Sequence, residues 1–315
     1  MEPAEITALA QDIRENIPGF AVESVEFEGE GDFCRAYTVN QAWIFRFAHN
    51  DEGSMTLERE AALLPRLAPT VHMAIPNIAY FGSRRADGRA FVGYPKIQGV
   101  ALTRERWLAL EPLERERCAS DLAGFLREFH SFSTEEARSL EVPECDYPFC
   151  RTEDGIMPGT ASHLYGRELR RLLGYPALDV GARRYCERLV ELLLDGGRGR
   201  DLPPTLVHGD LSHDHVLLDP QTGRVAGVID FSDAIITTPA LDFMYLYHAY
   251  GKDFLALLLG HYGAAGAQRI TAHALLLHQW YTAIRLLWAL DNHYQAGIEA
   301  RLRDLNRIAS SPPEF

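Results

Sequence analysis

Two short stretches of the chain carry aspartates in a pattern suited to chemistry. The first is Val207-His208-Gly209-Asp210 and the second is Val228-Ile229-Asp230-Phe231. Each apolar run ends at a carboxylate, so a hairpin-like connection can bring Asp210 and Asp230 to one end of a cleft. One carboxylate can then take a proton from a hydroxyl group while the other holds a divalent cation against phosphate oxygens. Isolated aspartates more often cap turns, but this pair of motifs favours phosphoryl transfer.

These residues resemble the aminoglycoside phosphotransferase family, which shares the protein-kinase-like fold, and their motif is most similar to that of the 2″-aminoglycoside phosphotransferases and related antibiotic kinases. The similarity extends to Thr238-Pro239-Ala240-Leu241-Asp242-Phe243. The resemblance implies that Asp210 is the catalytic aspartate and that Asp230 is a ligand of Mg²⁺. It also implies a metal role for His215, although the family places an amide there and Mg²⁺ prefers oxygen ligands.

The fold that this resemblance implies is α+β and bilobal. A small N-terminal lobe with an antiparallel sheet would span residues 1–98 and bind the nucleotide, and a mostly helical lobe would span residues 99–315. The residue pattern agrees with this division. A helix is expected over 5–17, strands over 22–28, 34–40 and 42–48, a further helix around 55–64, and a strand ending in a linker over 89–98. Later helices are expected over 103–110, 112–132, 162–174, 180–195, 239–250, 252–263, 267–292 and 294–309.

The nucleotide, ATP or GTP, is expected to lie between a glycine turn and the linker of the first lobe. Gly29 and Gly31 sit in a turn between two predicted strands, where glycine permits close approach of the backbone to phosphates. An ordinary hairpin turn would use the same residues. Tyr94, Lys96 and Ile97 lie in the linker, which the resemblance identifies as the hinge that recognises the nucleobase. The sequence leaves open which of the two nucleobases is preferred.

Kinase-like lobes hold the phosphates with a cation on the third strand, paired with a glutamate on the next helix. The chain has only two lysines against 29 arginines, and neither lysine lies on that strand. Arg46 does, and a guanidinium can contact phosphate oxygens with two nitrogens. An exposed arginine on an edge strand is the alternative. Glu60 is the expected partner of Arg46, with Glu58 as the other candidate.

Composition limits the class of protein. The net charge of −13 argues against a nucleic-acid partner and suits a cationic substrate. No apolar run approaches the length of a membrane span, and the acidic N-terminus is unlike a signal peptide. The five cysteines form no metal-binding pattern, so reduced thiols are expected. We therefore expect a cytoplasmic protein that acts as a monomer or a weak dimer.

The substrate is expected to be a small-molecule antibiotic, and an aminoglycoside would need carboxylates around its ammonium groups. Macrolides, nucleoside antibiotics and small metabolites remain alternative substrates, because the segment 243–248 lacks acidic residues. A pseudokinase that binds nucleotide without catalysis is the non-enzymatic alternative. The aromatic residues Trp280, Tyr281, Trp288 and Tyr294 could stack on sugar or base rings, although helical spacing in this stretch is equally typical of a buried helix. The candidate substrate residues are Ser212, Asp214, Asp233, Trp280 and Asp291.

Overall fold

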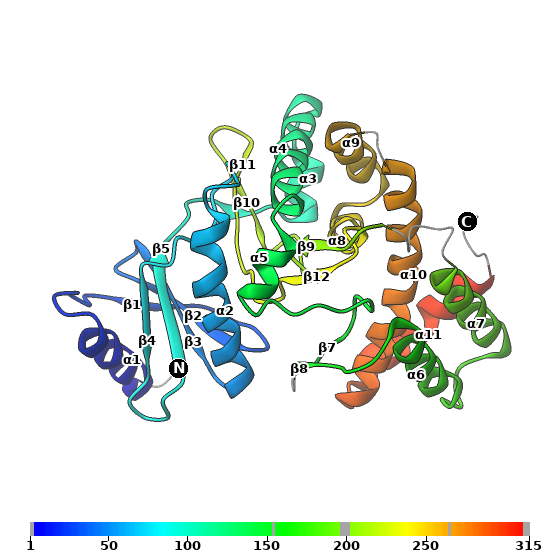
Figure 1. Cartoon of the computed structure of the whole chain (residues 1–315), viewed down its shortest axis with the longest axis horizontal. Helices are drawn as coiled ribbons and strands as arrows, with labels where there is room; N and C mark the ends of the chain where they lie inside the picture. Colours follow the sequence, from blue (N-terminus) through cyan, green and yellow to red (C-terminus); the bar gives the residue numbers. More distant parts are fainter. Residues whose placement is uncertain (1–2, 153–154, 196–201, 264–265, 311–315) are drawn as a thin grey trace.

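The first part of the computed structural model is a sheet of five antiparallel strands in the order β1-β2-β3-β5-β4 (Figure 1). The structure describes residues 3–152, 155–195, 202–263 and 266–310. The elements of this part are helix α1 (Pro3–Asn16), strands β1 (Val25–Glu30), β2 (Cys34–Val39) and β3 (Trp43–Ala48), helix α2 (Asp51–Leu67), and strands β4 (Tyr80–Ser83) and β5 (Ala90–Pro95).

Alternation along β3 assigns its side chains to two different layers. Phe45 and Phe47 join an aromatic core that packs against α1, whereas Ile44 and Ala48 join a separate core against α2. Figure 1 shows the two helices on opposite sides of the sheet. Arg46 shares the α2 side, so its guanidinium is directed at this helix rather than at solvent.

The rest of the chain is mostly helical. The long helix α10 runs through this region, and α6, α7 and α11 lie at the end remote from the sheet (Figure 1). The helices are α3 (Arg104–Ala109), α4 (Pro112–His130), α5 (Thr134–Ser139), α6 (Ala161–Leu173), α7 (Val180–Leu194), α8 (Ala240–Tyr250), α9 (Lys252–Tyr262), α10 (Ala267–Asp291) and α11 (Gln295–Ser310). Within the described ranges, no helix is both long and apolar enough to cross a bilayer.

Short strands also belong to this part of the chain, and β9 to β12 among them position the candidate site. The short strands are β6 (Val100–Ala101), β7 (Arg151–Thr152), β8 (Gly155–Ile156), β9 (Thr205–Val207), β10 (Val216–Asp219), β11 (Arg224–Val228) and β12 (Ile235–Thr237). Strand β10 pairs antiparallel with β11, and β9 pairs antiparallel with β12. Because loop 208–215 joins β9 to β10 and loop 229–234 joins β11 to β12, both pairs hold these two loops side by side.

The predicted kinase-like fold is confirmed, and most predicted helices agree with the structure to within one or two residues. The division at residue 98 stays a prediction. Helix α5 and strand β4 were not predicted, and other details differ as well. The first strand begins at Val25 rather than Val22, and α2 begins earlier than predicted, at Asp51, because the Asn50 side chain accepts a hydrogen bond from the Gly53 amide and caps it. The hairpin between the two aspartates is β10–β11, and the run before Asp210 pairs instead with β12.

Candidate functional site

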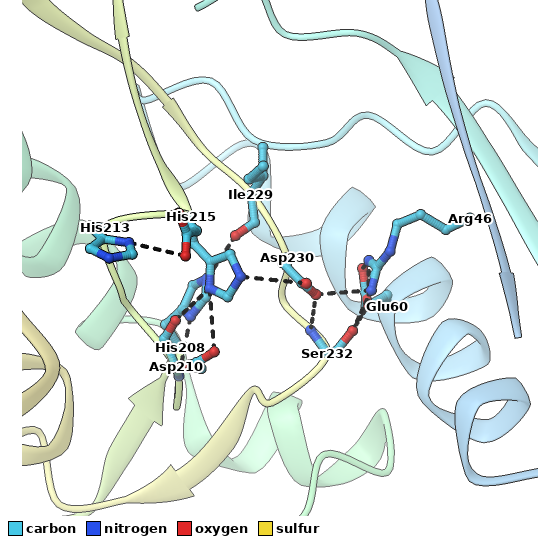
Figure 2. A network of polar contacts seen from close by, with 10 residues as sticks. Arg46, Glu60, His208, Asp210, His213, His215, Ile229, Asp230 and Ser232 are labelled. Atoms are coloured by element: carbon cyan, nitrogen blue, oxygen red, sulfur yellow. Dashed lines mark hydrogen bonds and ion pairs between the residues drawn. The ribbon is translucent and has the colours of Figure 1, made fainter. Parts of the chain in front are cut away.

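The two loops bring Asp210 and Asp230 to opposite sides of one imidazole (Figure 2). His215 Nδ1 donates to the backbone oxygen of Asp210 at 2.6 Å, which fixes the proton on that nitrogen. The other ring nitrogen, Nε2, lies 3.6 Å from Asp230 Oδ2, and Nδ1 lies 3.5 Å from Asp210 Oδ2. The sequence expectation that the two carboxylates share one site is therefore met by the geometry, with His215 between them.

Arg46 connects the N-terminal sheet to the same site. Its Nη1 donates to both carboxylate oxygens of Glu60, at 2.9 and 2.8 Å, and its Nη2 donates to Asp230 Oδ1 at 2.9 Å and to the hydroxyl of Ser232 (Figure 2). That hydroxyl in turn donates to Glu60 at 2.8 Å. Arg46 and Glu60 are almost fully buried, whereas Glu58 is exposed. The partner of Arg46 is thus Glu60, and the edge-strand alternative for Arg46 is excluded.

The two aspartates experience different electrostatic environments. Burial raises the pKa of Asp210, and the charge of Asp230 adds to that rise. Burial also opposes ionisation of Asp230, but Arg46 and His215 together hold the pKa of Asp230 below its usual value. Asp230 is therefore the permanently ionised carboxylate, suited to a cation, and Asp210 is the more basic one, suited to accepting a proton. Neighbouring groups whose environments separate their pKa values are typical of acid–base sites.

His208 joins the two loops as a neutral side chain. It is fully buried, and burial lowers its pKa to about 4. Its Nε2 donates to the Ile229 oxygen at 3.0 Å, and its Nδ1 accepts from the Asp210 amide at 3.4 Å. Gly209 follows with a φ of 83°, and a Cβ there would collide with the backbone oxygen of Asp233, so no other residue fits. The His-Gly-Asp sequence is thus explained by the close approach of the loops.

Asp242, in the first turn of α8, holds loop 208–215 in place through hydrogen bonds. Its side chain is fully buried and accepts from the backbone amides of His208 at 3.0 Å and Gly209 at 3.1 Å. It also accepts from His130 Nε2 at 3.0 Å, and His130 Nδ1 accepts from the Tyr262 hydroxyl at 3.0 Å. Asp242 was not assigned a role from the sequence. Its position, as an acidic residue at a helix start within the segment that resembles the family, could have indicated one.

We expect Asp242→Asn to lower both stability and turnover. An amide offers one acceptor oxygen where the loop and His130 use two, so at least one buried donor loses its partner. Loss of a hydrogen bond to a charged group typically costs about 1.5–3 kcal/mol. Urea unfolding and turnover should be measured against Asp253→Asn, an exposed aspartate in the first turn of α9. Unchanged stability in Asp242→Asn would show that the network does not hold the loop.

A cavity of about 750 Å³ opens in front of Asp210. We call it the Asp210 cavity, and its walls come from the turn after β1, the segment before β7, and helices α6, α8 and α10. Its charged and aromatic lining residues include Asp32, Tyr147, Phe149, Arg167, Glu168, Arg171, Asp210, Asp233, Tyr245, Tyr281, Arg285, Trp288 and Asp291. Of these, Asp32, Arg167, Glu168, Arg171 and Arg285 were not assigned to the substrate from the sequence, because their meeting depends on tertiary packing.

The predicted substrate residues divide between this cavity and other places. Asp233 and Asp291 line the cavity, although Asp291 forms an ion pair with Arg171 at 2.5 Å. Ser212 and Asp214 are not among the lining residues. Trp280 was wrongly assigned, because it is fully buried and donates to the Tyr147 hydroxyl at 3.2 Å. The exposed tryptophan of α10 that reaches the cavity is Trp288.

The predicted nucleotide residues lie in the N-terminal sheet and its exit. Gly29 is placed at an irregularity of β1, and both Gly29 and Gly31 have open space where a side chain would be. Tyr94 is buried in the core on the Arg46 side of the sheet. Lys96 is engaged within the protein, since its amide donates to the Ala42 oxygen and its ammonium bonds Glu28 and Thr38. A nucleobase therefore cannot use the Lys96 amide in this conformation, and contacts by Gly29, Gly31, Tyr94 and Ile97 stay predictions.

Comparison with known proteins identifies a family with the expected fold and chemistry. A model of the phosphotransferase enzyme family matches residues 28–277. The GDP and kanamycin complex of APH(2″)-IIIa superposes with a TM-score of 0.85 and 29% identity, covering 97% of this chain and 99% of that one. A macrolide 2′-phosphotransferase of type I has a TM-score of 0.72 and 22% identity, covering 97% and 98%, which shows a shared fold.

A shorter match is found in Bacillus subtilis. The uncharacterized protein YcbJ is 41% identical over 64 residues, which is 20% of this chain and 21% of YcbJ. This match is local, whereas the family model covers most of the chain, including the glycine turn, Arg46, both aspartate loops and the start of α8. The chain therefore belongs to the phosphotransferase enzyme family.

Proposed function

We propose that this protein transfers the terminal phosphoryl group of ATP or GTP to a hydroxyl group of an antibiotic, with an aminoglycoside as the first candidate. The observation that supports this proposal best is the position of Asp210, which lines a cavity large enough for a small molecule while its neighbour Asp230 contacts Arg46 on the other side. The likeness to the kanamycin complex favours an aminoglycoside over other acceptors. Phosphorylation in the cytoplasm would confer resistance.

In the proposed reaction, the acceptor hydroxyl lies against the Asp210 carboxylate and gives up its proton to it. The hydroxyl oxygen forms a bond to the terminal phosphorus, and the bond from that phosphorus to the bridging oxygen of the nucleoside diphosphate breaks. Arg46 balances the charge on the phosphates with its guanidinium, while Glu60 and Ser232 hold that side chain in place.

Asp230 is the residue proposed to hold Mg²⁺. In the described part of the chain no three His, Cys, Asp or Glu side chains gather as a ready metal site. That observation fits Mg²⁺, which commonly uses one or two carboxylates, with water and substrate phosphates as its other ligands. When bound, the ion would neutralise charge on the phosphates. His215 fits less well, since its Nδ1 is committed to Asp210 and its pKa is raised: burial alone would lower that pKa, but Asp230 and Asp210 outweigh it.

We expect Asp230→Asn to weaken nucleotide binding that depends on Mg²⁺, with activity partly restored by raised Mg²⁺. His215→Ala should give a smaller defect of the same kind. Activity should be titrated against Mg²⁺ for each variant and for Asp146→Asn, an exposed aspartate outside the site. An unchanged metal requirement in Asp230→Asn would remove Asp230 from the metal site.

The substrate proposal is tested with purified protein and a panel of acceptors. Release of nucleoside diphosphate and phosphorylation of the acceptor, seen by mass spectrometry, should be measured with aminoglycosides, a macrolide and a nucleoside antibiotic, using ATP and GTP in turn. Cells that express the chain should be compared with cells that express Asp210→Ala in growth inhibition by the same drugs. Nucleotide binding without turnover on any acceptor would favour the pseudokinase. Turnover confined to a non-antibiotic hydroxyl compound would favour a metabolite kinase.

A further inference from the structure

The Asp210 cavity holds three arginines, and two of them are neutralised by neighbouring carboxylates. Arg167 and Arg171 both bond Glu168, at 2.5 and 2.7 Å, and Arg171 also bonds Asp291. Glu168 is buried, so these contacts are sheltered from solvent. In this part of the wall the opposite charges largely cancel, and neither carboxylate is left unpaired for a substrate ammonium.

Arg285 is different. It lines the same cavity, and within residues 3–152, 155–195, 202–263 and 266–310 it forms no ion pair with a carboxylate. Its guanidinium carbon lies 5.7 Å from the centre of the Tyr281 ring, and Nη1 donates to His248 Nε2 at 3.4 Å. Tyr281 in turn stacks on Phe149, with ring centres 5.8 Å apart. The side chain is thus held against aromatic rings while it keeps a full positive charge.

The histidine pair His248 and His278 accepts a hydrogen bond from Arg285 and does not neutralise its charge. Arginine can only donate, so His248 Nε2 must carry a lone pair, and His248 Nδ1 then donates to His278 Nε2 at 3.2 Å. Burial lowers the pKa of both histidines, that of His278 to about 4, so both are neutral near pH 7. His248 therefore holds Nη1 of Arg285 in place and leaves the other N–H groups of the guanidinium for a ligand.

Arg285 and the catalytic aspartate line the same cavity. Tyr281 contacts Arg285 on one side, and the charge of Asp210 helps to raise the pKa of Tyr281, after the larger effect of burial. At the Asp210 end, the cavity wall carries three carboxylates, Asp32, Asp210 and Asp233. The cavity is therefore polarised, with negative charge around the acceptor hydroxyl and a positive charge over Tyr281.

We propose that Arg285 is a specificity-determining residue that binds an oxygen-bearing group of the acceptor, such as a hydroxyl, and rejects an ammonium group at that place. This inference rests on the proposed function and narrows its substrate class. The preferred acceptor has its ammonium groups near Asp210 and a ring rich in hydroxyls over Tyr281. Stacking of an arginine on an aromatic ring leaves its edge free to donate.

The test uses pairs of aminoglycosides that differ by one amine in place of a hydroxyl, such as neomycin with paromomycin and kanamycin B with kanamycin A. We expect the hydroxyl member of at least one pair to bind more tightly and to have the higher kcat/KM in the wild type. Loss of a hydrogen bond to a charged group is worth roughly 10- to 100-fold. In Arg285→Gln the ratio of kcat/KM for the hydroxyl member to that for the amine member should therefore fall towards one. In Arg285→Glu the amine member should be preferred.

Two further variants separate this role from a structural one. His248→Phe removes the acceptor behind Arg285 and should weaken the preference, whereas His248→Gln retains an acceptor and should restore part of it. Arg303→Gln, an exposed arginine of α11, is the matched control. The KM for nucleotide should not change in any of these variants, because Arg285 does not contact Arg46, Asp230 or the glycine turn.

Affinity should be measured by calorimetry alongside turnover, so that two failures can be told apart. A binding preference without any phosphorylation would overturn the proposed function and support the inference. Equal binding and turnover of both members of every pair, or a preference that survives in Arg285→Glu, would overturn the inference alone. Failure of every aminoglycoside to bind would overturn both.

Discussion

Asp210→Ala should abolish nearly all phosphoryl transfer while nucleotide binding remains close to that of the wild type. Removal of a general base typically lowers the rate by ~10²–10⁴. Binding should survive because Arg46, Glu60, Ser232 and Asp230 bond one another without any contribution from the Asp210 side chain. Turnover on the best acceptor and calorimetric titration with nucleotide test the two halves of this expectation.

The matched control is Asp214→Asn, because Asp214 is an exposed carboxylate of the same loop that does not line the cavity. It should keep near-normal turnover. The pH profile gives a second check. Burial raises the pKa of Asp210, and a base must be deprotonated, so activity should fall on the acidic side at a pH above that of an ordinary aspartate. If Asp210→Ala retains near-full turnover, another residue accepts the proton.

The sequence predicted those parts of the site that depend on local pattern. Alternation along residues 43–48 placed Arg46 on one face of a strand, and two apolar runs that end at Asp210 and Asp230 placed both carboxylates at loop starts. The choice between Glu60 and Glu58 required the structure. Only the rotation of α2 against the sheet decides which glutamate is buried.

The residues that line the Asp210 cavity were much harder to predict, and helix α10 shows the physical reason. Trp280 and Trp288 lie on one helix at helical spacing, yet Trp280 is buried among Tyr147 and Tyr165 while Trp288 is exposed. Hydrophobic periodicity does not show where a helix leaves the core. The charge of the wall was equally hidden, because the pairing of Asp291 with Arg171 joins residues on α10 and α6 that are far apart in sequence.

Arg46→Met should produce the largest change in stability together with a loss of nucleotide affinity. Glu60 is buried with an exposed fraction of 2%, and burial already raises its pKa. Without Arg46, this carboxylate has no cation, and breaking a buried pair in this way costs about 3–5 kcal/mol. Arg46→Lys keeps the charge but loses the two-pronged guanidinium that reaches Glu60 and Asp230 together. Its stability and its nucleotide affinity should therefore lie between those of Arg46→Met and the wild type.

A double variant separates the structural role of Arg46 from its role in binding phosphate. Arg46→Met combined with Glu60→Gln removes the unpaired carboxylate, so stability should recover in large part relative to Arg46→Met alone. The KM for nucleotide should stay raised by roughly 10- to 100-fold, as expected for lost hydrogen bonds to a charged group. Glu58→Gln, on the exposed side of the same helix, is the control. Because stability and nucleotide affinity are then measured in one protein, recovery of both would show that Arg46 serves only to neutralise Glu60, and recovery of stability alone identifies it as the cation that holds the phosphates.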